Sequence, residues 1–140
     1  MVIKTKSIYE PAEKNDDGIR VLFTRYYPRG VKKDKFDFWI RELSPSRNLL
    51  KNYRQGKYNW EEFKTVFMSE IRDNKDSLER IEDLNVQNEF LVITLLCYEI
   101  EGENCHRYIV KDIIENPQLL YVNSVHNNKL KSETNSTTLL

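Results

Sequence analysis

LVITLLCYE, at residues 91–99, is apolar at both odd and even positions up to Cys97. That pattern is typical of a strand buried on both faces, in the middle of a parallel sheet. The run turns polar at Tyr98 and Glu99, and after a short gap NCHR at residues 104–107 opens an apolar pattern with helical spacing. We therefore predict a central strand, a loop, and a helix whose first turn carries a thiol, an imidazole and a guanidinium.

The rest of the chain alternates between strand-like and helix-like segments. Residues 2–9 and 19–27 are predicted strands, and in the second Val21, Phe23, Arg25 and Tyr27 share one face. A short strand is also predicted at residues 119–122. Apolar residues at three- and four-residue steps predict helices at residues 34–43, 46–53, 60–74, 76–84 and 104–114. This order predicts a single α/β domain, with a small, mainly parallel sheet flanked by helices in Rossmann-like layering.

Length and composition set the domain limits. The chain has 140 residues, enough for one domain of ordinary size. We place that domain at residues 1–117 and a C-terminal extension at 118–140. From about residue 126 the sequence is rich in Asn, Lys, Ser and Thr, so this part is predicted to be largely disordered.

Charge and hydropathy exclude several classes of protein. Lys plus Arg and Asp plus Glu both number 22, so the chain has no overall attraction for nucleic acid or anionic membranes. No apolar run reaches the roughly 18 residues that span a bilayer, and the N-terminus lacks a signal-peptide core. We therefore expect a cytoplasmic protein with no membrane partner, in which Cys97 and Cys105 are thiols.

The candidate site follows from the parallel sheet, because ligands bind at the carboxyl ends of such strands. A helix N-terminus and basic neighbours favour a thiolate, so Cys105 is the candidate nucleophile. His106 or Glu99 would move protons. A small anionic or phosphate-bearing ligand would be bound by residues at the two strand ends, namely Arg25, Arg29, Arg107 and Cys97.

Each of these residues also has a structural interpretation. Cys105 could be a small buried residue at a helix start. His106 could cap the helix or face solvent, and Arg107 could pair with Glu99 or Glu103. The arginine and carboxylate groups, Arg25 included, would then form an ion-pair network without catalysis.

Several better-defined motifs are absent. An arginine at the spacing of a cysteine-phosphatase loop would fall on Glu103 or Lys111, and the four glycines are scattered, so no nucleotide cofactor is predicted. A structural zinc site needs four ligands, and Cys97, Cys105 and His106 supply three, so no metal is predicted and zinc stays a minor alternative. A redox pair between the two cysteines is geometrically possible without a CxxC motif.

A binding module without chemistry is the alternative function. Its partner would be nucleic acid, or a protein, and the contacts would come from basic and aromatic side chains. The residues concerned are Arg29, Lys32, Lys33, Lys35, Arg47, Lys51, Tyr53, Arg54, Lys57 and Tyr58.

Several motifs together resemble the YeaO-like family, domain of unknown function 488. They are DGIRVL at residues 17–22, RYYPRGV at 25–31, Trp39 with ELSPS at 42–46, Trp60 with Phe63, CYE at 97–99 and CHR at 105–107. The resemblance covers roughly residues 1–115 and implies a small cytosolic α/β protein whose activity is not established. Thr24 departs from the pattern, because the family usually has an acidic residue or asparagine before this arginine.

Overall fold

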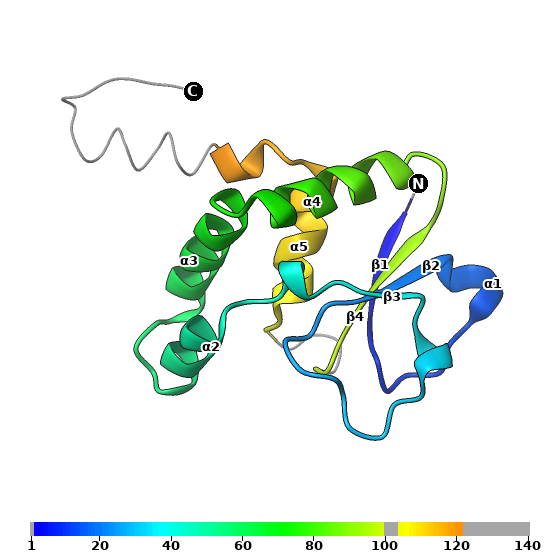
Figure 1. Cartoon of the computed structure of the whole chain (residues 1–140), viewed down its shortest axis with the longest axis horizontal. Helices are drawn as coiled ribbons and strands as arrows, with labels where there is room; N and C mark the ends of the chain where they lie inside the picture. The colour runs from blue at the N-terminus through cyan, green and yellow to red at the C-terminus, as the bar shows by residue number, and fades with distance from the viewer. Residues whose placement is uncertain (1, 100–103, 122–140) are drawn as a thin grey trace.

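The protein is described by a computed structural model covering residues 2–99 and 104–121. Its four parallel strands lie in the order β1-β4-β2-β3 (Figure 1). They are β1 (Ile3–Ser7), β2 (Ile19–Leu22), β3 (Phe38–Trp39) and β4 (Ile93–Cys97). The apolar pattern on both faces of residues 91–97 predicts a central strand, and β4 does lie between β1 and β2. The chain is thus a small single-domain α/β protein, as predicted.

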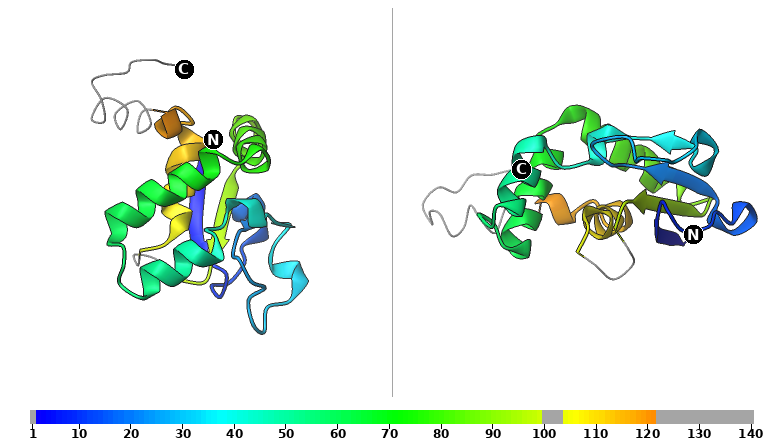
Figure 2. Two further views of the ribbon diagram at one scale, coloured as in Figure 1. Left: turned by 60° about the vertical axis from the view of Figure 1, so that its left-hand side comes forward. Right: turned by 90° about the horizontal axis from the view of Figure 1, so that it is seen from below.

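Helices and 3-10 turns make up much of the rest of the described chain. The helices are α1 (Lys14–Asp17), α2 (Arg47–Arg54), α3 (Trp60–Arg72), α4 (Lys75–Gln87) and α5 (His106–Glu115), and the turns are η1 (Lys33–Lys35) and η2 (Arg41–Leu43). Helix α5 packs on β1 and β4, α4 packs on α5, and α3 packs on α4. Figures 1 and 2 show α2 to α5 gathered beside the strands, with α5 nearest to them.

Two clusters of buried side chains cover the two faces of the sheet. The larger joins the helices to one face of the strands, through Ile3, Val21, Ile93, Leu95 and Cys97. The smaller lies on the other face and consists of Ile8, Leu22 and Leu96, covered by Val31, Phe36 and Trp39. Cys97 therefore points toward the helices, from the last position of β4.

The predicted helix at residues 34–43 is wrong. Phe38 and Trp39 instead pair with β2 as an edge strand, and the Trp39 Nε1 donates to the Thr24 carbonyl over 2.9 Å. Phe36 and Trp39 pack in the smaller cluster, whereas Ile40 and Leu43 belong to the larger one. The apparent helical stripe is thus a segment that crosses the sheet edge and supplies both faces.

Polar side chains cap several of the helices. Ser46 caps α2, with its hydroxyl accepting from the Leu49 N–H. Asn74, rather than Asp76, caps α4, because the helix begins one residue before Asp76 and an asparagine oxygen caps as well as a carboxylate. Cys105, rather than Asn104, is the N-cap of α5.

The C-terminal end differs as well. Residues 119–121 are helical, so the strand predicted at residues 119–122 is wrong over its described part. The N–H groups of Leu119, Leu120 and Tyr121 all donate to carbonyls three residues earlier in the chain, so they are used in local turns and not in the sheet. The predicted disorder from residue 126 lies outside the described residues. No helix within residues 2–99 or 104–121 is long and apolar enough to cross a bilayer.

Candidate functional site

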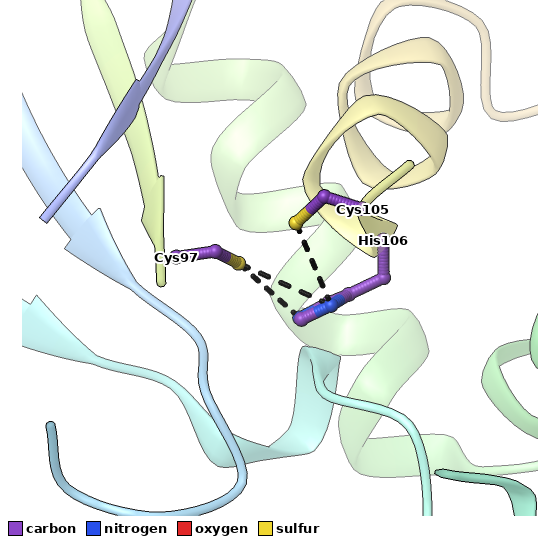
Figure 3. Close-up of side chains that lie close together, drawn as sticks. All are labelled: Cys97, Cys105 and His106. Carbon is purple, nitrogen blue, oxygen red and sulfur yellow. Dashed lines mark hydrogen bonds between the residues drawn. The ribbon is translucent and has the colours of Figure 1, made fainter. Parts of the chain in front are cut away.

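Two cysteines and a histidine meet where β4 ends and α5 begins. Cys97 is the last residue of β4, Cys105 caps α5, and His106 is the first residue of that helix. The two sulfur atoms and a ring nitrogen of His106 all lie within 4.8 Å of one another. Figure 3 shows both sulfur atoms pointing toward the imidazole ring. We call Cys97, Cys105 and His106 the thiol–imidazole cluster.

The backbone directly after β2 fixes the hydrogen on His106. Its Nε2 lies 2.7 Å from the carbonyl oxygen of Phe23, and a carbonyl can only accept, so Nε2 carries the hydrogen. In the neutral ring Nδ1 is then the lone-pair atom, and it lies 4.0 Å from each of the two sulfur atoms, whereas the Cys97 sulfur is 3.4 Å from Nε2. The rings of Phe23 and Phe67 meet the imidazole edge-on, at centroid distances of 5.1 and 5.7 Å.

Cys105 is the residue of the cluster whose thiolate is stabilised. A hydrogen bond from Cys97 and the neighbouring His106 lower the pKa of Cys105 to about 4, against the opposing effect of burial. The Arg107 backbone N–H, in the first turn of α5, donates to the sulfur over 3.5 Å. Burial and the hydrogen bond to Cys105 raise the pKa of Cys97, so this residue stays a thiol. Both cysteines are free and buried.

Glu99 lies just beyond the end of β4, beside this cluster. Burial raises the pKa of its carboxyl, and the adjacent charge of Cys105 raises it further. Its Oε1 is buried and takes no hydrogen bond from residues 2–99 or 104–121. A buried carboxyl with a raised pKa next to a thiolate has the properties of a proton donor.

Arg107 is fully buried and joins the end of β4 to α5. Its Nη1 donates to the Glu99 carbonyl oxygen over 2.7 Å, and its Nη2 donates to the Tyr108 hydroxyl over 3.2 Å. The guanidinium also lies over the Tyr108 ring, 5.0 Å from its centroid. These contacts hold the loop end against the helix, and ligand binding by Arg107 stays a prediction.

Arg25 lines a separate pocket of about 480 Å³. Its Nε donates to the Pro45 carbonyl over 3.1 Å and its Nη2 to the Ser44 carbonyl over 3.3 Å. Phe67, whose ring also contacts His106, forms part of the wall. The remaining lining residues are Arg41, Glu42, Ser44, Ser46, Glu70, Ile71, Asp73, Asn74 and Ser77. Phe67 is therefore shared between this pocket and the thiol–imidazole cluster.

Arg29 lies apart from both places. Its side chain is exposed and its carbonyl accepts from the Tyr9 hydroxyl over 3.2 Å. It lines neither the pocket nor the cluster. Of the residues named from sequence, Cys97, Cys105 and His106 are brought together, Glu99 and Arg107 lie beside them, and Arg25 lies in the neighbouring pocket.

Two elements of the site had no recognisable signal in the sequence. The Phe23 carbonyl orients His106, but a backbone group leaves no residue signature. Phe67 follows the helical spacing of α3, which predicts a core residue and nothing more. Thr24, the departure from the family pattern, is buried and donates its hydroxyl hydrogen to the Tyr26 carbonyl over 2.6 Å, so it supports the loop after β2.

The cluster also has the donor atoms that zinc prefers, two sulfurs and an imidazole nitrogen. Three protein ligands are one fewer than a structural zinc site uses and equal those of a catalytic one. The cluster could therefore hold a metal ion, and experiments on its thiols need a chelator.

Comparison with known proteins identifies the family of this chain. The family model DUF488-N3a, described as "Active DUF488-N3 subclade", matches residues 3–118. "Uncharacterized protein YeaO" of Escherichia coli is 33% identical over 86 residues, which make up 60% of this chain and 74% of that protein. "Uncharacterized protein Mb3100c" of Mycobacterium bovis is 30% identical over 74 residues, or 51% and 62% of the two chains. No solved structure matches. The chain belongs to the DUF488 family and is YeaO-like.

Proposed function

We propose that this protein is a cysteine-dependent enzyme in which the Cys105 thiolate attacks a small electrophilic substrate. The observation that carries the proposal is the position of Cys105, which caps α5 with Cys97 and His106 beside its sulfur. A thiolate is the reactive form of cysteine, and a helix N-terminus with hydrogen-bond donors stabilises it. The name of the matching subclade, which contains the word "Active", agrees with an enzyme.

The neighbouring groups have complementary roles in this proposal. Cys97 donates its S–H to the thiolate and keeps Cys105 ionised. His106, held by the Phe23 carbonyl, presents Nδ1 as a base on the side of the sulfurs. Glu99 supplies a proton to a leaving group, because its carboxyl is buried and has a raised pKa.

The Arg25 pocket is the proposed place for the rest of the substrate. Its lining contains two arginines and three carboxylates, Arg25, Arg41, Glu42, Glu70 and Asp73. Glu70 is already engaged, since it accepts from the Ser46 N–H and hydroxyl. We therefore propose a small polar ligand whose anionic group meets Arg25 and whose hydrogen-bond donors meet the carboxylates.

Alkylation mapped to each cysteine tests the nucleophile. Full-length protein with a chelator present is treated with limiting iodoacetamide at neutral pH, and peptides are then mapped by mass spectrometry. Cys105 should be labelled before Cys97, and Cys105→Ser should abolish the early label. Equal labelling of the two cysteines, or labelling of Cys97 first, would remove Cys105 from this role.

Protection from labelling tests the pocket. Inorganic phosphate and small carboxylates serve as probes, and each is added before iodoacetamide. The proposal predicts slower Cys105 labelling in the wild type and loss of the protection in Arg25→Gln. Arg29→Gln is the matched control, because Arg29 is exposed and lies outside the pocket. Equal protection of both variants would exclude Arg25 from ligand binding.

A further inference from the structure

The second thiol of the cluster, Cys97, is not a reactant in a simple nucleophilic attack by Cys105, yet its sulfur lies close to the Cys105 sulfur. Cys97 Sγ and Cys105 Sγ are within 4.8 Å of each other, and both residues are unoxidised. A disulfide bond is about 2 Å long, so the two sulfurs need to approach each other by less than about 3 Å. We propose that Cys105 and Cys97 form a redox pair that reduces small hydroperoxides.

Burial selects the size of the oxidant. Cys105 is 3% exposed and Cys97 is fully buried. A bulky electrophile in solvent therefore has little access to the Cys105 sulfur and none to the Cys97 sulfur. Burial therefore favours hydrogen peroxide, or another small hydroperoxide, as the oxidant of Cys105. Cys97 then has one reaction partner within reach, which is oxidised Cys105.

The chemistry balances in two steps. The Cys105 thiolate attacks one peroxide oxygen, so that an S–O bond forms, the O–O bond breaks and the alkoxide or hydroxide leaves as alcohol or water after taking a proton. This step oxidises Cys105 to a sulfenic acid and reduces the peroxide. The Cys97 sulfur then attacks the sulfenic sulfur, an S–S bond forms, and the hydroxyl leaves as water with the Cys97 proton.

Neighbouring residues fit these steps. The Arg107 N–H donates to the Cys105 sulfur and holds it at the start of α5. His106 Nδ1 lies 4.0 Å from both sulfurs, where it can take the Cys97 proton as the disulfide forms. An external dithiol reductant would return the pair to the thiol state by exchange.

This inference rests on the proposed nucleophile and gives it a substrate class, small hydroperoxides, that does not require the Arg25 pocket. It adds a specific requirement, which is that Cys97 resolves the oxidised form of Cys105. Alkylation of Cys105 does not need Cys97 as a reactant, so the redox pair can be disproved while Cys105 remains a nucleophile.

The test treats reduced, chelated, full-length protein with stoichiometric hydrogen peroxide and follows intact mass. Wild type should lose two hydrogen atoms, which a dithiol reductant restores, with Cys97 and Cys105 joined in the mapped peptide. Cys97→Ser should instead accumulate a sulfenic acid that dimedone traps, and Cys105→Ser should give neither product. Circular dichroism of each variant checks that the fold is kept, and serine is close in size to cysteine.

The pH dependence of the oxidation rate supplies a second readout, which does not depend on the variants. Between about pH 8 and about pH 6 the thiolate fraction of free cysteine falls roughly 75-fold, whereas the oxidation of Cys105 should change less than about twofold. Dimedone trapping in wild type to the same extent as in Cys97→Ser would overturn the inference. So would normal Cys105 alkylation without any disulfide after peroxide, and that result would leave the nucleophile proposal intact.

Discussion

The Nε2 of His106 lies 2.7 Å from the carbonyl oxygen of Phe23, directly after β2. This contact joins two residues 83 positions apart and brings the end of β2 to the first turn of α5. Because the carbonyl requires the hydrogen on Nε2, the contact also decides that Nδ1 is the ring nitrogen with a lone pair when the imidazole is neutral. The geometry of the thiol–imidazole cluster therefore depends on the sheet as much as on α5.

Removal of the Cys97 thiol should raise the pKa of Cys105. Cys97→Ala deletes the hydrogen-bond donor that contributes most to the lowered value, so the Cys105 pKa should move toward that of an ordinary thiol. Cys97→Ser keeps an O–H donor and should cause a smaller rise. Thiolate absorbance in the ultraviolet, titrated against pH, measures both changes. Identical titration midpoints for Cys97→Ala and wild type would show that Cys97 does not stabilise the thiolate.

Arg107→Met should destabilise the fold by about 2 to 4 kcal/mol, because it leaves the Glu99 carbonyl without its buried donor. Urea unfolding measures the change. Arg29→Met is the control: Arg29 is exposed, and its replacement should change the stability by less than about 0.5 kcal/mol. Similar small effects at both positions would argue against Arg107 as the structural link between β4 and α5.

Gly18→Ala should be among the most destabilising small substitutions in the chain. Gly18 has a φ of 63°, and a Cβ there would lie 2.0 Å from the Val92 carbonyl oxygen, on backbone next to β4. Gly56 has a similar φ of 78° with open space around it. Thermal or urea unfolding should therefore give a loss of about 3 kcal/mol or more for Gly18→Ala and about 1 for Gly56→Ala. Equal losses would mean that the β2–β4 contact is looser than described.

Folding stability should depend on pH through Cys105. Its folded pKa is depressed, so between about pH 4 and the pKa of an ordinary thiol the unfolded chain binds more protons. The contribution of the thiolate to stability is therefore complete above the unfolded pKa and is lost as the pH falls through about 4. The stability difference between wild type and Cys105→Ser should rise with pH across this window. A flat difference would indicate a normal thiol.

The secondary structure was predictable from the sequence where all apolar residues of a segment are buried in the same environment. The two-sided apolar run that became β4 and the stripe of Trp60, Phe63, Phe67 and Ile71 in α3 each reflect burial in one environment. Residues 34–43 misled because Phe36 and Leu43 are buried on opposite faces of the sheet, and their spacing imitates a helix. A pattern in one segment cannot show which side of a distant strand each residue will meet.

The sequence was enough to predict which residues form the site but not how their side chains are oriented. The chain positions of Cys97 and Cys105, at a strand end and a helix start, were readable from the sequence. The orientation of His106 depends on a backbone carbonyl from β2, and the position of Arg25 depends on the carbonyls of Ser44 and Pro45. Backbone acceptors carry no side-chain identity, so these contacts appear only in the folded chain.

The rate of Cys105 alkylation as a function of pH tests the central claim most directly. The profile reports the thiolate fraction, and burial, which slows a given reagent equally at every pH, does not change its shape. We predict a rate that is nearly constant at neutral pH and falls by half near the Cys105 pKa of about 4, with circular dichroism confirming the fold at each pH. A rate that rises tenfold per pH unit through neutrality, as for free cysteine, would contradict the account.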